Sequence, residues 1–155
     1  MVVSALAPPK TFNILIANET TTNDILSRLV LQGIIDYDNI TQEVQPGLCR
    51  SWETSPDGTV WTFHLRRGLK WSDGHPLTAD DVLFTSRVVF DEKIHPSAAD
   101  LLIVNGVKPV FTKIDDLNFT VTLPEPFGPF VYVISSMRIM PRHKLETAFE
   151  EGRFE

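Results

Sequence analysis

The sequence has little cysteine, no long apolar run and no concentration of positive charge. Its single cysteine, Cys49, cannot form an internal disulfide, so we interpret it as a small core residue. No apolar run approaches the ~18 residues that a membrane-spanning helix needs. The 14 Lys and Arg are outnumbered by 20 Asp and Glu, for a net charge of −6. Without a basic cluster, binding to nucleic acid is not expected.

Recognisable catalytic and metal-binding patterns are also missing. The four histidines show no metal-ligand spacing such as His-x-x-x-His, and there is neither a Gly-x-Ser-x-Gly elbow nor a glycine-rich phosphate loop. His64 and His75 have no evident partner, and we expect His64 to be solvated. The adjacent pairs Asp80-Asp81 and Asp115-Asp116 are explained more simply by capping and turn formation than by acid/base chemistry. We therefore predict no metal, no cofactor and no catalytic residue.

A β-hairpin is the clearest element in the sequence. The turn sequence Ser55-Pro56-Asp57-Gly58 separates segments 48–53 and 59–66. In the second segment apolar and polar residues alternate, which predicts a strand with one buried face. The same alternation follows at 119–123, so a further strand of the same sheet is expected.

The remaining segments predict short helices and strands around this sheet. We expect a strand over 12–16, a helix from about residue 23 to Gly33, and an extended segment 34–37. Thr78 is a good N-cap for a helix whose apolar stripe includes Val82, Leu83, Val89 and Phe90. A short helix should begin at Ser97, and a last one should run from Pro141 to Phe149. The predicted fold class is mixed α+β, an antiparallel sheet with one face covered by helices.

Several of these motifs, taken together, resemble the family 5 extracellular solute-binding proteins, the oligopeptide- and dipeptide-binding components of ABC importers. The motifs are Pro46-Gly47-Leu48, Ser51-Trp52-Glu53, Trp61-Thr62-Phe63-His64-Leu65-Arg66, Trp71-Ser72-Asp73-Gly74, Pro76-Leu77-Thr78-Ala79-Asp80-Asp81-Val82, Phe119-Thr120-Val121-Thr122-Leu123, Glu125-Pro126-Phe127 and Met140-Pro141-Arg142-His143. The resemblance implies a larger two-lobed fold, of which this chain is the small accessory domain of the first lobe. We expect residues 1–155 to form one domain, truncated from a longer protein, with a flexible segment 1–10.

The resemblance also implies a few ligand-binding residues. In peptide-binding relatives an acidic residue after the first strand lies near the bound peptide, and Glu19, with Asn18 and Thr20, occupies that place here. The alternative is that these residues only cap the first helix. Some relatives carry a peptide-facing aromatic where this chain has Ser97, and this departure puts tri- to pentapeptide substrates in doubt.

The function implied by the resemblance is capture of peptides or similar solutes, without catalysis, and their delivery to an ABC-transporter permease. The expected location is periplasmic or extracellular, with lipid anchoring of the full-length protein left open. One alternative is a receptor for a non-peptide solute such as a nickel chelate or an oligosaccharide. Another is a module that docks to the importer or to another protein, which an exposed apolar patch of Phe127, Phe130 and Tyr132 would favour.

Overall fold

The structure is a computed structural model that describes residues 31–38, 40–94 and 97–153. Three predictions concern other residues: the flexible segment 1–10, the strand over 12–16 and the helix that starts near residue 23. They fall outside the described part of the chain and stay predictions.

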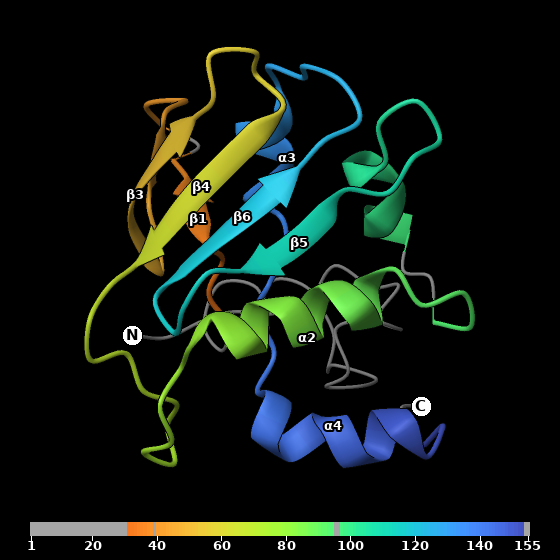
Figure 1. The fold of residues 1–155 in the computed structure, drawn as a ribbon. Coiled ribbons are helices and arrows are strands. Elements are labelled where there is room, and N and C mark those ends of the chain that lie inside the picture. Colours follow the sequence, from red (N-terminus) through yellow and green to blue (C-terminus); the bar gives the residue numbers. More distant parts are fainter. Residues whose placement is uncertain (1–30, 39, 95–96, 154–155) are drawn as a thin grey trace.

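A four-stranded antiparallel sheet forms the centre of the molecule (Figure 1). Its strands are β3 (Cys49–Thr54), β4 (Val60–Leu65), β6 (Asn118–Thr122) and β5 (Val110–Lys113), in the spatial order β3-β4-β6-β5. The hairpin predicted around residues 55–58 is confirmed as β3 and β4, with Gly58 in the left-handed region at φ 73°. The strand predicted at 119–123 is confirmed as β6, which pairs with β4.

The predicted one-sided character of the sheet is also confirmed. Trp61, Phe63 and Leu65 of β4 are buried, whereas the residues between them are only half-buried. Phe63 stacks on Phe119 of the neighbouring strand, with ring centroids 5.2 Å apart. Burial of each such side chain contributes roughly 1.5–3 kcal/mol.

Short helix α3 (Phe130–Ile134) packs against the buried face of the sheet. The Phe130 ring lies 5.6 Å from that of Trp61, and Phe130 is fully buried. Phe130 therefore cannot contribute to the exposed patch of Phe127, Phe130 and Tyr132 that would favour a docking module. Only Tyr132 among the three is a large exposed side chain, because residues 130 and 134 make up the inward side of this short helix.

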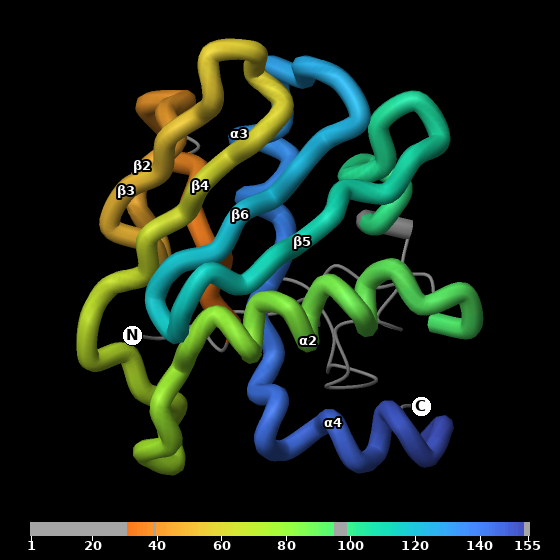
Figure 2. The backbone as a smooth tube through the Cα atoms, in the orientation of Figure 1, coloured from red at the N-terminus to blue at the C-terminus, as the bar shows by residue number. Residues whose placement is uncertain are grey.

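The remaining helices lie beside and below the sheet (Figure 2). Helix α2 (Ala79–Val89) packs against β5 on one side and against α4 (Arg142–Glu150) on the other. The predicted helix at Ser97 is the 3-10 helix η2 (Ser97–Leu102). In the predicted stripe of α2, Val82 and Val89 are buried, but Leu83 and Phe90 are only partly so.

A second, two-stranded sheet is formed by β1 (Ile35–Tyr37) and β2 (Val44–Pro46). Directly before β1, Gly33 forms an antiparallel bridge with Arg138, and the Ile139 N–H donates to the Gln32 carbonyl at 3.2 Å. Two segments about a hundred residues apart in the sequence therefore run side by side. The extended segment predicted at 34–37 is confirmed, as is the mixed α+β fold class.

Candidate functional site

The ligand-binding residues predicted from the resemblance are Asn18, Glu19, Thr20 and Ser97, and the structure does not test them. Asn18, Glu19 and Thr20 lie outside the described residues. Ser97 is the first residue of η2, and its side chain is likewise not described. The role of these four residues stays a prediction.

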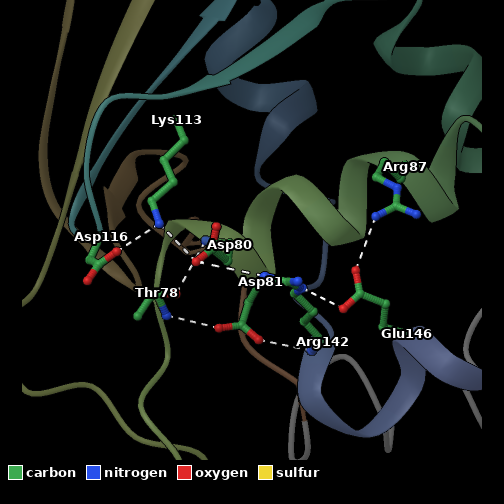
Figure 3. Close-up of polar contacts among 8 residues, drawn as sticks. All are labelled: Thr78, Asp80, Asp81, Arg87, Lys113, Asp116, Arg142 and Glu146. Carbon is green, nitrogen blue, oxygen red and sulfur yellow. Dashed lines mark hydrogen bonds and ion pairs between the residues drawn. The ribbon is translucent and has the colours of Figure 1, made fainter.

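A cluster of polar side chains surrounds the start of α2 and joins it to β5 and α4 (Figure 3). We call it the α2–α4 cluster; its residues are Thr78, Asp80, Asp81, Arg87, Lys113, Asp116, Arg142 and Glu146. Its centre is a capping box, in which Thr78 accepts from the Asp80 N–H and Asp81 accepts from the Thr78 N–H at 2.9 Å. The capping role predicted for Thr78 and Asp81 is confirmed.

Asp81 also joins α2 to the last helix. Its second carboxylate oxygen accepts from the Arg142 backbone N–H at 2.9 Å, and its side chain is almost completely buried. This N–H belongs to the first residue of α4, where no carbonyl of the same helix can pair with it. One buried carboxylate therefore satisfies donors at the starts of two helices.

Asp80 lies in the first turn of α2, as expected, but its carboxylate also connects the helix to β5. It accepts from the Lys113 Nζ of β5 at 2.8 Å, and the same Nζ lies 2.7 Å from Asp116. These two hydrogen bonds, first that of Asp116 and then that of Asp80, raise the pKa of Lys113. This contact could not be predicted from the sequence, because Asp80 and Lys113 are distant along the chain. Asp115 does form the predicted turn, accepting from the Leu117 N–H at 2.8 Å.

The outer side of the cluster consists of two ion pairs that share Glu146, one within α4 and one between α4 and α2. Glu146 pairs with Arg142 at 2.7 Å on its own helix and with Arg87 of α2 at 3.2 Å. The Glu146 hydrogen bond raises the pKa of Arg142. Both pairs are partly exposed, so each is worth no more than about 1 kcal/mol and serves mainly to align the helices.

An open groove of about 470 Å³ borders this cluster. On one side of the groove the rings of His75 and His143 stack with centroids 4.0 Å apart, and the Nε2 of His143 lies 2.8 Å from Asp73. The pKa of Asp73 is lowered, chiefly by the hydrogen bond from His143. Because His75 stacks on His143, the expectation that His75 has no partner is wrong.

The expectation that His64 is solvated is also wrong. Its Nδ1 lies 2.5 Å from the Asn118 side chain oxygen, and its Nε2 lies 3.5 Å from Glu53. Both contacts come from strands that pair with β4, so they depend on sheet register. Sequence order alone did not reveal them.

These arrangements favour a structural role for the polar residues. Within the described ranges, no group of three or more His, Cys, Asp or Glu side chains is placed to hold a metal ion. Cys49 is buried, as predicted, and burial raises the pKa of its thiol to about 11, which makes it a poor nucleophile at neutral pH. None of the described helices is long and apolar enough to cross a membrane.

The sequence matches the family model for bacterial extracellular solute-binding proteins, family 5 middle, over residues 43–154. It is 36% identical to the periplasmic oligopeptide-binding protein OppA of Escherichia coli over 69% of this chain and 22% of that protein. It is 34% identical to the probable deoxycholate-binding periplasmic protein YgiS of Escherichia coli, over 79% of this chain and 25% of that protein.

A solved structure agrees with these sequence matches. The complex of Haemophilus influenzae OppA with RPPGFSPFR superposes with a TM-score of 0.78 at 29% identity, and covers 91% of this chain and 30% of that one. The chain thus spans between a fifth and a third of the length of the proteins to which it is similar.

Proposed function

This chain belongs to the bacterial extracellular solute-binding proteins of family 5, and from that premise we propose that it is part of a receptor that captures peptides for an ABC importer. The observation that carries the proposal is the similarity to oligopeptide-binding OppA in both sequence and fold. The rest of the protein would complete a two-lobed fold that closes over the solute by hinge motion. The receptor would work in the periplasm or at the outer cell surface, free or lipid-anchored, and deliver its solute to a membrane permease.

In this proposal the described unit is a frame for binding and breaks no bonds. Its charged side chains are used to hold elements together: Asp81 fastens α4 to α2, and Lys113 fastens β5 to the start of α2. Buried apolar rings fill the space behind the sheet. Such an arrangement suits a rigid support beside a solute cleft.

The residues proposed to contact solute are those that the resemblance indicated. Glu19, beside Asn18 and Thr20, would accept N–H donors of a bound peptide or pair with its ammonium group. Ser97 stands where some relatives carry an aromatic, so the pocket wall near η2 would be smaller and more polar than theirs.

Equilibrium binding to the full-length protein tests the proposal. Titration calorimetry with pools of di- to nonapeptides should show saturable binding, weakened at least about tenfold by Glu19→Gln because a charge-assisted contact is lost. Glu92→Gln removes an exposed carboxylate shortly after the C-terminal end of α2. It is the matched control and should bind as the parent does. Absence of binding to every peptide pool would reject peptide as the solute.

A non-peptide solute is the second candidate, favoured by the similarity to the probable deoxycholate-binding protein. The same calorimetry with deoxycholate, nickel chelates and oligosaccharides separates the two. Tight binding of one of these together with no peptide binding would establish the alternative.

A further inference from the structure

The tip of the β1–β2 hairpin carries the most exposed large apolar side chain in the described part of the chain. Ile40 is 93% exposed. Single exposed apolar residues are common on protein surfaces and need no explanation by themselves. Two further features of the structure near Ile40 are hydrogen bonds to the Asp38 carboxylate and two partly exposed tyrosines.

Hydrogen bonds connect Asp38 to the residues that follow the turn. The Asp38 carboxylate accepts from the backbone N–H groups of Ile40 at 2.7 Å and Thr41 at 3.2 Å. The Asp38 N–H donates to the Glu43 carbonyl at 2.9 Å, and Gln42 occupies the left-handed region at φ 58°. The bond from the Ile40 N–H is also the main reason that the pKa of Asp38 is lowered. These bonds connect residues 38, 40 and 41 and restrict the backbone next to Ile40.

Two tyrosines extend the apolar surface next to the hairpin. Tyr37, at the end of β1, and Tyr132, in α3, are 39% and 51% exposed. Their rings meet edge-to-face with centroids 5.9 Å apart. We call Tyr37, Ile40 and Tyr132 the hairpin-tip surface. Tyrosine is enriched among the residues that dominate binding at protein interfaces.

The base of the hairpin is anchored to the rest of the fold. Ile34 and Ile35 are fully buried, and Asp36 lies 3.5 Å from the Arg138 guanidinium. The hairpin is therefore continuous with the paired segments around Gly33 and Arg138.

The charge of the hairpin specifies what it can bind. Residues 35–46 include no Lys or Arg, and because Asp36 pairs with Arg138, the acidic residues near the tip are Asp38 and Glu43. The complementary surface is an apolar pocket with a rim of Lys or Arg side chains. A small solute is a poor fit, because solutes bind in concave sites, whereas Ile40 is almost fully exposed next to the turn.

We propose that the hairpin-tip surface docks into a basic-rimmed apolar pocket on the membrane permease of the importer. This inference rests on the proposed function, since it needs an importer that receives the solute. Ile40 would fill the pocket, the tyrosines would pack at its edge, and the hairpin carboxylates would steer the approach.

Affinity for the importer tests the proposal directly. The full-length, solute-loaded protein is titrated against the importer reconstituted in lipid nanodiscs, as the parent and as Ile40→Ser. The variant should bind the importer at least about tenfold more weakly, as for a buried hot-spot residue, while its solute affinity is unchanged. Glu43→Lys should slow association and reduce its dependence on salt.

Leu101→Ser is the matched control, because Leu101 is another exposed large apolar side chain, 60% exposed, on η2. It should bind the importer as the parent does. If Ile40→Ser binds the importer with parental affinity, the docking proposal is wrong even when solute binding is intact. A full-length protein that binds no solute at all would instead refute the proposed function.

Labelling separates docking from coverage by the rest of the protein. Ile40→Cys can be labelled selectively within this chain, because Cys49 is buried with a thiol pKa raised to about 11. Rapid maleimide labelling of Ile40→Cys in the full-length protein, slowed by added importer, supports docking. Lack of labelling without importer would show that other parts of the protein cover the tip, and would overturn the proposal.

Discussion

The side chain of Asp81 caps the helix in which it lies and also accepts the first backbone N–H of α4, at Arg142, 61 residues later in the sequence. Both bonds measure 2.9 Å, from the N–H of Thr78 to one oxygen and from that of Arg142 to the other. Because the carboxylate is almost completely buried, water cannot replace it as an acceptor. The position of α4 on α2 therefore depends on this residue.

Replacement of Asp81 by alanine should destabilise the protein by about 2–4 kcal/mol. The change removes an N-cap interaction and takes away the acceptor of the partly buried hydrogen bond from the Arg142 N–H. Urea unfolding followed by tryptophan fluorescence measures the loss. Asp80→Ala is the control: it breaks a partly exposed ion pair with Lys113 and should cost under about 1 kcal/mol. Equal losses in the two variants would contradict the role assigned to Asp81.

Thr85 provides a second link one turn further along α2. Its buried hydroxyl donates to the Asp81 carbonyl at 2.7 Å and accepts from the Met140 N–H at 2.9 Å. Thr85→Val keeps the shape of the side chain but leaves the Met140 N–H unpaired, so we expect a loss of about 1–3 kcal/mol. Thr85→Ser retains the hydroxyl and should lose clearly less. The urea unfolding midpoints of the two variants are compared with that of the parent. A Ser variant as unstable as the Val variant would show that the methyl group, not the hydroxyl, matters.

Features encoded by neighbouring residues could be predicted from the sequence. The β3–β4 hairpin follows from alternation around a Pro-Asp-Gly turn, and the start of α2 follows from Thr78 and Asp81, three residues apart. In each case the interacting groups lie within one turn or one strand pair. Local geometry then leaves few alternatives.

Contacts between distant residues could not be predicted in the same way. His143 meets Asp73 across 70 residues, and His64 meets Asn118 across 54 residues. Such pairs depend on strand order and helix packing, which a single sequence does not specify. The burial of Phe130 was missed for a related reason: the apolar run at 127–135 has no alternation to show which side faces the core.

Gly47 should not tolerate a side chain. A Cβ at this position would lie 2.7 Å from the Gly33 carbonyl oxygen and 3.2 Å from the Ile34 carbonyl oxygen. Backbone atoms cannot move aside easily, so Gly47→Ala should cost about 1–3 kcal/mol. Gly128→Ala is the control, because a Cβ there meets nothing within 4 Å, and its unfolding midpoint should equal that of the parent. If Gly47→Ala unfolds at the parental temperature, the close approach of residues 33 and 47 is not essential.

The contact between Asp73 and His143 should make stability depend on pH in the acid range. Asp73 accepts from His143 at 2.8 Å and from the His75 N–H at 3.1 Å, and it lies 3.0 Å from Lys144. These contacts, the one from His143 first, lower the pKa of Asp73 below its unfolded value of about 3.9.

The sign of the effect follows from linkage. A carboxyl group whose pKa is lower in the folded state stabilises the fold above its unfolded pKa, and this contribution is lost as the pH falls through the folded pKa. Asp73→Asn should therefore have a lower unfolding temperature than the parent at pH 6, and the difference should shrink progressively below about pH 4. Calorimetric scans between pH 2 and 7 measure both curves. Glu92→Gln should follow the parent throughout, and a pH-independent difference between parent and Asp73→Asn would show that the carboxylate's charge is not the source of the stabilisation.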